Sequence, residues 1–195
     1  MFFNRSKKAI KSNNKILLFL TTLSCLLYNP FTSAQECKTS NIASSNDPQQ
    51  FVINSQTGTV IDARTGLEWA ICSLGQTWQS GNCIGAPEHF SDYSTALNKA
   101  KTFTSNNAQW QEYRLPNIKE LGSIIEHSCH EPAINLNTFT GTLNAVYYSS
   151  TPDTQGNLHF SPLLGVKIID FTNGTEFVPD VSKFRYVRLV RSIND

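Results

Sequence analysis

The sequence predicts an α+β domain, and three observations carry this prediction. Two segments near the middle of the chain have apolar residues at helical spacing. Short apolar or alternating runs of strand type occur on both sides of them, and glycine-containing turns separate several of these runs. The length and an apolar fraction of 39% suit one domain with its own core. We therefore expect a single compact domain, in which two helices pack on a mostly antiparallel sheet.

The first strands are expected after residue 50, where a polar segment without periodicity gives way to FVINSQTGTVIDARTGLEWA. Two short apolar runs, Thr59 to Ile61 and Leu67 to Trp69, lie on either side of a turn at residues 63–66. Two such runs about a glycine-containing turn are typical of a β-hairpin.

Two helices are expected next. Residues 91–103 place apolar side chains at helical spacing, with Ser91 as a candidate N-cap. The second helix begins after Pro116: Asn117 can cap it, Glu120 can complete a capping box, and the helix is expected to end near His127.

The remainder of the chain predicts strands. Apolar or alternating runs occupy residues 146–150, 166–171, 176–178 and 184–191. Asn173-Gly174 lies between the second and third runs and is a strong signal for a hairpin turn.

The first 34 residues have the order of a secretory signal peptide. Basic residues precede an uncharged apolar run at 16–27, and the small-residue ending Thr32-Ser33-Ala34 follows. An uncleaved anchor is the alternative, but the run is short of the ~20 residues that span a bilayer. We expect cleavage after Ala34, a lead-in segment at 35–50 and the domain at 51–195. The protein is then periplasmic, secreted or on the cell surface.

Removal of the signal peptide changes the charge. The whole chain has 16 basic and 15 acidic residues, but five basic and no acidic residues lie in the first 34, which leaves 11 against 15, formally −4. A negative domain is a poor general binder of polyanions, and we expect no nucleic-acid partner.

Four cysteines remain after the signal peptide: Cys37, Cys72, Cys83 and Cys129. An even number in an exported chain indicates disulfides, since no pair has the close spacing of a structural zinc site or of a redox motif. Three pairings are possible. The most economical joins Cys72 to Cys83 around a glycine-containing loop, and Cys37 to Cys129.

Four stretches recur together in a known family: GTVIDARTGLEWAICSLGQTW, YRLPNIKELGSIIEHSCHEPAINLNTF, VYYSST and YVRLVR. In order and spacing they resemble the Lcl C-terminal domain family, named after the legionella collagen-like adhesin and largely catalogued as a domain of unknown function. The resemblance covers roughly residues 51–192. More loosely, RLPNIKEL with YYSS and VRLVR is similar to C-type-lectin-like and formylglycine-generating-type folds.

The resemblance implies a secreted or surface domain, which in some members is a trimeric adhesin for sulfated glycosaminoglycans. It also implies a C-type-lectin-like fold. This chain departs from that pattern, because it has no collagen-like repeats before the domain and its charge after residue 34 is negative.

Aromatic residues are the first candidates for a binding site. Trp78 lies mid-loop between two cysteines, with Gln76 among its polar neighbours. Such a tryptophan either stacks on a sugar or pins its loop to the domain, and the sequence leaves both readings open. Tyr147 and Tyr148 alternate along a predicted strand, so we expect one to face inward and the other outward.

Basic residues cluster near the end of the chain: Lys183, Arg185, Arg188 and Arg191. They are interpreted first as internal ion pairs and a solubilising edge, with at least one structural arginine. The alternative is a small anion-binding patch, in which Lys183 and Arg185 act as polar anchors.

Metal and catalytic sites are weaker candidates. Glu126, His127, Cys129, His130 and Glu131 lie close together, but across a helix end and around a cysteine with a disulfide role. No nucleophile elbow occurs, and a thiol in a disulfide is inert. We expect no metal, no cofactor and no enzymatic activity; an undetected hydrolase is a third reading.

These observations favour an exported, adhesin-like domain that binds a carbohydrate or another surface component, and that forms a homo-oligomer in one reading. The ligand site would comprise Trp78, Gln76, Tyr147, Tyr148, Lys183 and Arg185. The rival hypothesis is a structural module of the bacterial envelope or of a secreted complex, which binds a protein partner.

Overall fold

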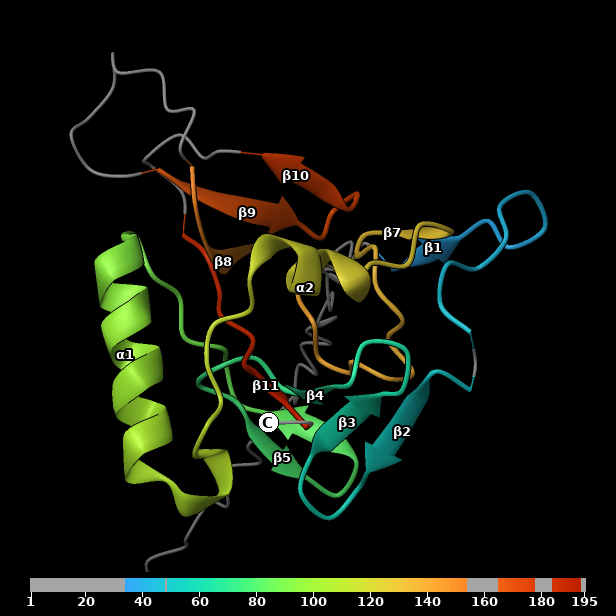
Figure 1. Cartoon of the computed structure of the whole chain (residues 1–195). Coiled ribbons are helices and arrows are strands. Elements are labelled where there is room, and N and C mark those ends of the chain that lie inside the picture. Colours follow the sequence, from blue (N-terminus) through green and yellow to red (C-terminus); the bar gives the residue numbers. More distant parts are fainter. Residues whose placement is uncertain (1–33, 48, 154–164, 178–183, 194–195) are drawn as a thin grey trace, which may run out of the picture. The chain divides into compact units, whose positions relative to one another are not determined.

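A four-stranded antiparallel sheet contains the predicted hairpin (Figure 1). The computed structural model describes residues 34–47, 49–153, 165–177 and 184–193. The order of the strands is β11-β4-β3-β2. Their bounds are β2 Phe51–Asn54, β3 Thr59–Asp62, β4 Leu67–Ala70 and β11 Val190–Ser192. The β3–β4 hairpin is confirmed, while β2, which pairs with β3 from Phe51 opposite Asp62 to Asn54 opposite Thr59, was not predicted.

A second, three-stranded sheet comes from the later part of the chain. Its order is β10-β9-β8, with β8 Val146–Pro152, β9 Val166–Asp170 and β10 Thr175–Phe177, and both pairings are antiparallel. The Asn173-Gly174 turn is confirmed: Gly174 has φ +76°, a conformation that glycine adopts without a steric penalty.

Two further pairs of short strands were not predicted. β1 (Glu36–Cys37) pairs with β7 (Cys129–His130), and β5 (Thr77–Gln79) pairs with β6 (Asn82–Ile84). Strands of two or three residues are too short to produce an alternating pattern. The Cys37–Cys129 disulfide joins β1 to β7, and Cys83 of β6 is bonded to Cys72. These bonds hold pairs that are too short to be stable by themselves.

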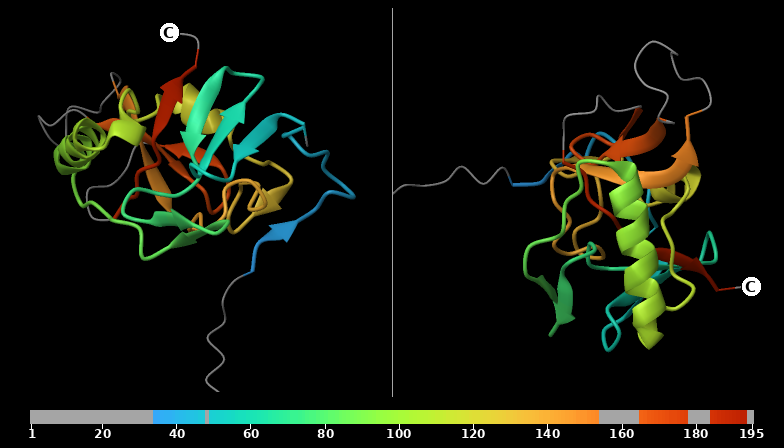
Figure 2. Two further views of the ribbon diagram at one scale, coloured as in Figure 1. Left: turned by 90° about the horizontal axis from the view of Figure 1, so that it is seen from below. Right: turned by 90° about the vertical axis from the view of Figure 1, so that its left-hand side faces the viewer.

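The two predicted helices are present (Figure 2). α1 spans Tyr93–Asn106, and its N-cap is Asp92 rather than Ser91: the Asp92 carboxylate accepts a hydrogen bond from the amide of Thr95. A short 3₁₀ helix, η1 (Ala108–Trp110), follows. α1 buries Ala96 and Ala100, whereas Leu97, another of the apolar residues at helical spacing, is 42% exposed.

α2 spans Ile118–Ser123 and begins with the predicted capping box between Asn117 and Glu120. It ends four residues before the expected position near His127. Ile124 and Ile125 follow the helix but are still buried in the core. Their apolar pattern therefore led to the prediction of a longer helix.

The last predicted strand, residues 184–191, is not continuous. Arg185 and Tyr186 form isolated bridges to Phe90 and Tyr147, and β11 begins only at Val190. The segment therefore passes from one set of partners to another, and strand alternation does not run through it.

Two clusters of buried side chains make up the core. One is centred on Trp69, Tyr147 and Phe139, and the other on Tyr148, Ile168 and Leu189. All these residues belong to one compact unit, Ser33–Asp195.

The structure confirms an α+β domain with two helices and antiparallel sheets, although it contains several sheets rather than one. In the described part of the chain, no helix is long and apolar enough to cross a membrane. The expected signal peptide lies outside the described residues, apart from Ala34.

Candidate functional site

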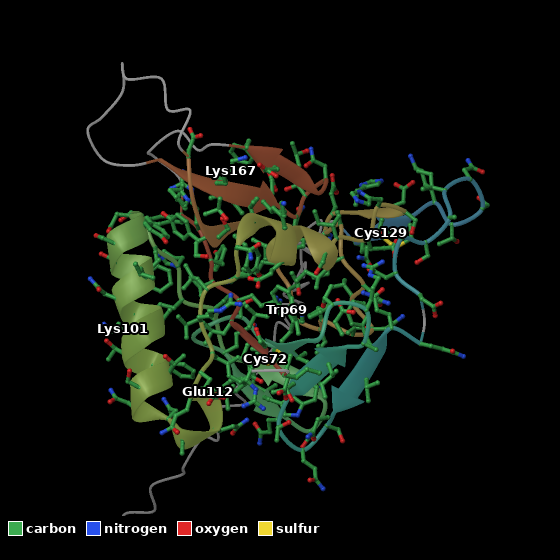
Figure 3. All side chains as sticks on the ribbon, in the orientation of Figure 1. Trp69, Cys72, Lys101, Glu112, Cys129 and Lys167 are labelled. Atoms are coloured by element: carbon green, nitrogen blue, oxygen red, sulfur yellow. A yellow bond between two sulfur atoms is a disulfide. The ribbon has the colours of Figure 1, made fainter. Side chains whose placement is uncertain are left out.

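The loop that contains Trp78 is held by a disulfide. Cys72 follows β4, Cys83 lies in β6, and they are joined with a Cα–Cα distance of 5.4 Å. Figure 3 labels Cys72 in the lower half of the domain, and Cys129, which is bonded to Cys37, beside β7. Both disulfides are the pairs that the sequence favoured.

Trp78 is attached to its own domain. Its indole N–H donates a hydrogen bond of 2.7 Å to the carbonyl of Ser55, in the turn between β2 and β3. The ring lies against Gly58, where a Cβ atom would come within 2.3 Å of the indole Cγ. From η1, the side-chain amide of Gln109 donates to the carbonyl of Thr57. The half-buried indole therefore pins its loop to the β2–β3 turn, in agreement with the second of the two readings.

Gln76 supports the same loop. Its side-chain oxygen accepts a hydrogen bond from the amide of Ser73, which closes the turn that follows Cys72. Gln76, Trp78 and Trp110 line a cavity of about 30 Å³. That volume has room for about one or two water molecules but not for a sugar ring. In this structure Trp78 and Gln76 do not form a saccharide pocket.

Tyr147 and Tyr148 are both buried, with exposed fractions of 0% and 2%, so the expectation that one faces outward is wrong. Alternation does send them to opposite faces of β8, but each face meets a different core cluster. The Tyr147 hydroxyl bonds with that of Ser73 over 2.8 Å, and the Tyr148 ring lies 5.7 Å from that of Tyr93.

The described arginines near the end of the chain are buried or paired, in agreement with the first interpretation rather than with the alternative of an anion-binding patch. Arg185 is only 3% exposed; its guanidinium donates to the Tyr148 hydroxyl and lies over that ring, so it is not a surface anchor. Arg191 pairs with Glu68, which raises the pKa of the guanidinium, and Lys167 pairs with Glu176. Lys183, the other predicted anchor, lies outside the described residues.

Arg188 is the structural arginine that the sequence predicted, but its partners are not acidic. Its guanidinium donates to the carbonyls of Ala70 and Ile71 and to the hydroxyl of Thr142, and it lies 5.1 Å from the Phe139 ring centroid. Complete burial lowers the pKa of this guanidinium. Carbonyl dipoles and aromatic faces thus hold a charge inside the domain.

An exposed aromatic patch, which the sequence did not single out, lies where the segment beginning at Phe184 pairs with the segment around Phe90. It consists of His89, Phe184 and Tyr186. Phe184 is 62% exposed, and its ring lies edge-on to that of His89 with centroids 4.3 Å apart. Tyr186 is half-buried, 6.4 Å from His89, and its ring packs on buried Tyr147.

Backbone pairing explains this arrangement. Phe90 and Arg185 exchange two hydrogen bonds, of 2.8 and 3.0 Å, which places His89 opposite Tyr186. Alternation then turns Arg185 inward, and Phe184 and Tyr186 to the other side. The signal in the sequence was the spacing of Phe184 and Tyr186, two residues apart; the contribution of His89 depends on tertiary pairing.

Glu126 and His130, two members of the candidate metal cluster, contact other groups of the domain. The Glu126 carboxylate accepts hydrogen bonds from Ser44, Ser45, Asn46 and Ser128, the shortest being 2.5 Å from Ser44 Oγ. Burial raises the pKa of Glu126, but these hydrogen bonds outweigh burial and lower it to about 2. Nε2 of His130 lies 3.4 Å from the Glu36 carboxylate. Among the described residues, no group of three or more His, Cys, Asp and Glu side chains could hold a metal ion.

The Lcl C-terminal domain model matches residues 58–191, more than half of the chain. The chain belongs to the Lcl C-terminal domain family. Neither the curated proteins nor the solved structures give a match. The looser likeness to C-type-lectin-like folds therefore stays a prediction.

The match to the Lcl C-terminal domain starts at Gly58, yet the structure joins earlier residues firmly to it. The side-chain amide of Gln35 donates to the carbonyls of Pro132 and Ile134, and Cys37 is bonded to Cys129. Together with the Glu126 hydrogen bonds, these contacts dock the expected lead-in segment on the domain. The boundary at residue 50 stays a prediction.

Proposed function

We propose that this Lcl C-terminal domain is an exported binding domain without enzymatic activity, and that it binds a carbohydrate of a surface in an adhesin-like role. The observation that carries the proposal is the exposure of Phe184. A side chain that is 62% exposed and held edge-on against a second ring offers an apolar face at little conformational cost. Membership of an adhesin-related family supports the same role.

The aromatic patch favours neutral sugars over sulfated ones. The C–H face of a pyranose ring is flat and apolar, so it can stack on Phe184, while hydroxyl groups reach the exposed His89 and the half-buried Tyr186. The described arginines nearby are buried or paired with a carboxylate, and the chain beyond residue 34 has an excess of acidic residues. Both features disfavour a polyanion.

The absence of enzymatic activity is also part of the proposal. Cys37, Cys72, Cys83 and Cys129 are all in disulfides, so none of them supplies a nucleophilic thiolate. The Glu126 carboxylate is engaged by the hydrogen bonds already described, and a carboxyl with its pKa lowered to about 2 is a weak general base.

A glycan array tests the proposal. The exported protein in its oxidised form is screened at physiological and at raised salt, with the variant Phe184→Ala and the control Phe177→Ala. Phe177 is also an exposed aromatic residue, at 38%, but lies in β10. We expect retention by neutral glycans that resists salt, is lost at least tenfold in Phe184→Ala and persists in Phe177→Ala.

Two results would contradict the proposal. Retention only by sulfated glycans, lost at raised salt, would indicate an electrostatic site elsewhere. An empty array with folded protein would argue against a carbohydrate ligand. Protein binding is the second candidate function, and the exposed apolar side chains of the edge strand β2 favour it.

A further inference from the structure

β2 is the outer strand of the four-stranded sheet, and one side of its backbone has no strand partner among the described residues (Figure 1). The amide of Ala63 bonds to the carbonyl of Gln50, and that of Ile71 bonds to the carbonyl of Gly58. Antiparallel strands alternate bonded and non-bonded pairs. Residues 50, 52 and 54 therefore direct their backbone groups to β3. Phe51 and Ile53 direct their N–H and C=O groups away from the sheet.

The side chains of β2 are uncharged and partly exposed. Val52 is 59% and Ile53 45% exposed, and Phe51 is half-buried against Phe139. The flanking residues 49–50 and 54–57 are also uncharged. Exposed edge strands are commonly blocked by a charge, a proline or a bulge, and Phe51–Asn54 has none of these.

We propose that β2 is a docking edge for a second copy of this chain, in an antiparallel β2–β2 pair about a two-fold axis. Only outward-facing groups can bond across the axis, and the register centred on Val52 is the one in which both outward-facing residues of each β2 strand bond to the other β2 strand. Phe51 lies opposite Ile53 of the partner subunit, and Val52 lies opposite Val52 of the partner subunit. Phe51 and Ile53 each exchange backbone hydrogen bonds with the opposite strand.

The same register matches the side chains. Val60, opposite Ile53 on β3, is fully buried, so Ile53 and Phe51 lie on the core side of the sheet. In the pair, each Phe51 packs beside Ile53 of the partner subunit and continues the apolar face. The two Val52 side chains meet on the outer face, where β-branched pairs stabilise a sheet. No charge of one copy faces a like charge of the other within residues 49–55.

A second copy fits this edge better than an unrelated ligand, because the edge is complementary to itself in hydrogen bonding and in apolar side chains, and no charge repels the second copy. Four residues a side make a small interface, so the dimer is weak and depends on concentration. On a surface with many ligands, two linked binding sites gain avidity, which compensates for a weak single site. The proposal does not depend on the nature of the ligand.

Sedimentation equilibrium of the exported protein tests the pairing. We expect the mass to rise with concentration from one chain to two. Val52→Lys places two ammonium groups together at the axis, and should weaken association at least tenfold. The control Ile84→Lys introduces the same charge at a residue that is 51% exposed but lies in β6, and should leave association unchanged.

Cysteine substitution tests the register. Opposed residues of a non-bonded pair have the separation that a disulfide needs, so Val52→Cys should cross-link two chains on mild oxidation. Ile53→Cys should not cross-link, since the two Ile53 residues are offset along the strands. A protein that stays monomeric at the highest soluble concentration, a three-chain mass, association unaffected by Val52→Lys, or cross-linking through residue 53 instead of 52 would each overturn the proposal.

Discussion

The indole N–H of Trp78 donates a hydrogen bond to the carbonyl of Ser55, 23 residues earlier in the chain, over 2.7 Å. This contact joins the disulfide-bonded β5–β6 hairpin to the β2–β3 turn. The same indole ring presses on Gly58, so hydrogen bonding and packing act at one place. Trp78 is thus a structural link between two hairpins.

Replacement of Trp78 should lower stability. Trp78→Phe removes the hydrogen bond and should reduce the free energy of unfolding by about 1 kcal/mol. Trp78→Ala also removes the packing, and should cost about 2–3 kcal/mol. Denaturant unfolding of the oxidised protein measures both. Ile84→Ala, on the same hairpin but 51% exposed, is the control and should change stability by less than about 0.5 kcal/mol. Unchanged stability together with lost glycan retention would instead make Trp78 a ligand contact.

The glycine beneath the indole should not tolerate a side chain. Gly58 has φ +71°, and a Cβ atom there would overlap the ring. Gly58→Ala should destabilise the domain by about 1–3 kcal/mol. In the double variant Gly58→Ala with Trp78→Ala, the overlap with the ring atoms is absent, although the Cβ of residue 78, 2.5 Å away, remains. The sum of the losses of stability in the two single variants should therefore exceed the loss measured for the double variant. Simple additivity would show that the ring does not rest on Gly58.

Glu126 should contribute stability that depends on pH. Its pKa falls from 4.5 to about 2 on folding, so its contribution is complete above about pH 5 and is lost as the pH falls from about 4.5 towards 2. By the usual conversion, the shift corresponds to about 3 kcal/mol, and solvent screening of this partly solvated group reduces that contribution. Glu126→Gln should therefore be less stable than the parent at pH 7, and the difference should shrink below pH 4.5. Unfolding curves at pH 7, 4 and 2.5 check this. A difference independent of pH would contradict the assignment.

The disulfide between Cys37 and Cys129 should hold the docked lead-in segment. It spans 92 residues, and loop closure of that size corresponds to about 4–5 kcal/mol in the chain-entropy model. The double variant Cys37→Ser, Cys129→Ser should be less stable and should expose residues 35–46 to proteases. The matched variant Cys72→Ser, Cys83→Ser opens a loop of only 11 residues, which corresponds to about 3 kcal/mol. Equal protease resistance of the lead-in segment in both variants would show that the other contacts suffice.

Arg188 should tolerate neither a lysine nor an apolar residue. Arg188→Lys keeps the charge but cannot reproduce a planar fork that reaches two carbonyls and a hydroxyl. Arg188→Met leaves the buried carbonyls without a donor. Each should cost about 2–4 kcal/mol in the free energy of unfolding. Lys101→Met, at an exposed position on α1, is the control for loss of a charge and should change stability little. An Arg188→Met variant as stable as the parent would show that the buried charge is dispensable.

Local features were predictable where neighbouring residues decide the conformation. The capping box joins Asn117 and Glu120, which are only three positions apart, and the Asn173-Gly174 turn depends on two adjacent residues. The β3–β4 hairpin follows from apolar runs about a short turn. β2 was missed because Phe51–Asn54 contains three consecutive apolar residues and shows no alternation of apolar and polar positions.

The candidate site was less predictable, because exposure is a property of the assembled domain. The residues chosen from the sequence, Tyr147, Tyr148 and Arg185, are buried, while Phe184 is exposed. His89 joins the aromatic patch only because Phe90 pairs with Arg185, 95 residues later in the chain. No local pattern indicates such a pairing.

The amino-acid sequence by itself determined the α+β class, the start of the second helix, two hairpins and the favoured cysteine pairs, since these depend on spacing along the chain. Only the tertiary structure decided which faces meet solvent. Alternation places Tyr147 and Tyr148 on opposite sides of β8, but both sides are covered, because that strand lies between two apolar clusters. Likewise, an arginine is charged wherever it lies. Its place in the core depends on carbonyls and rings that the rest of the fold brings around Arg188.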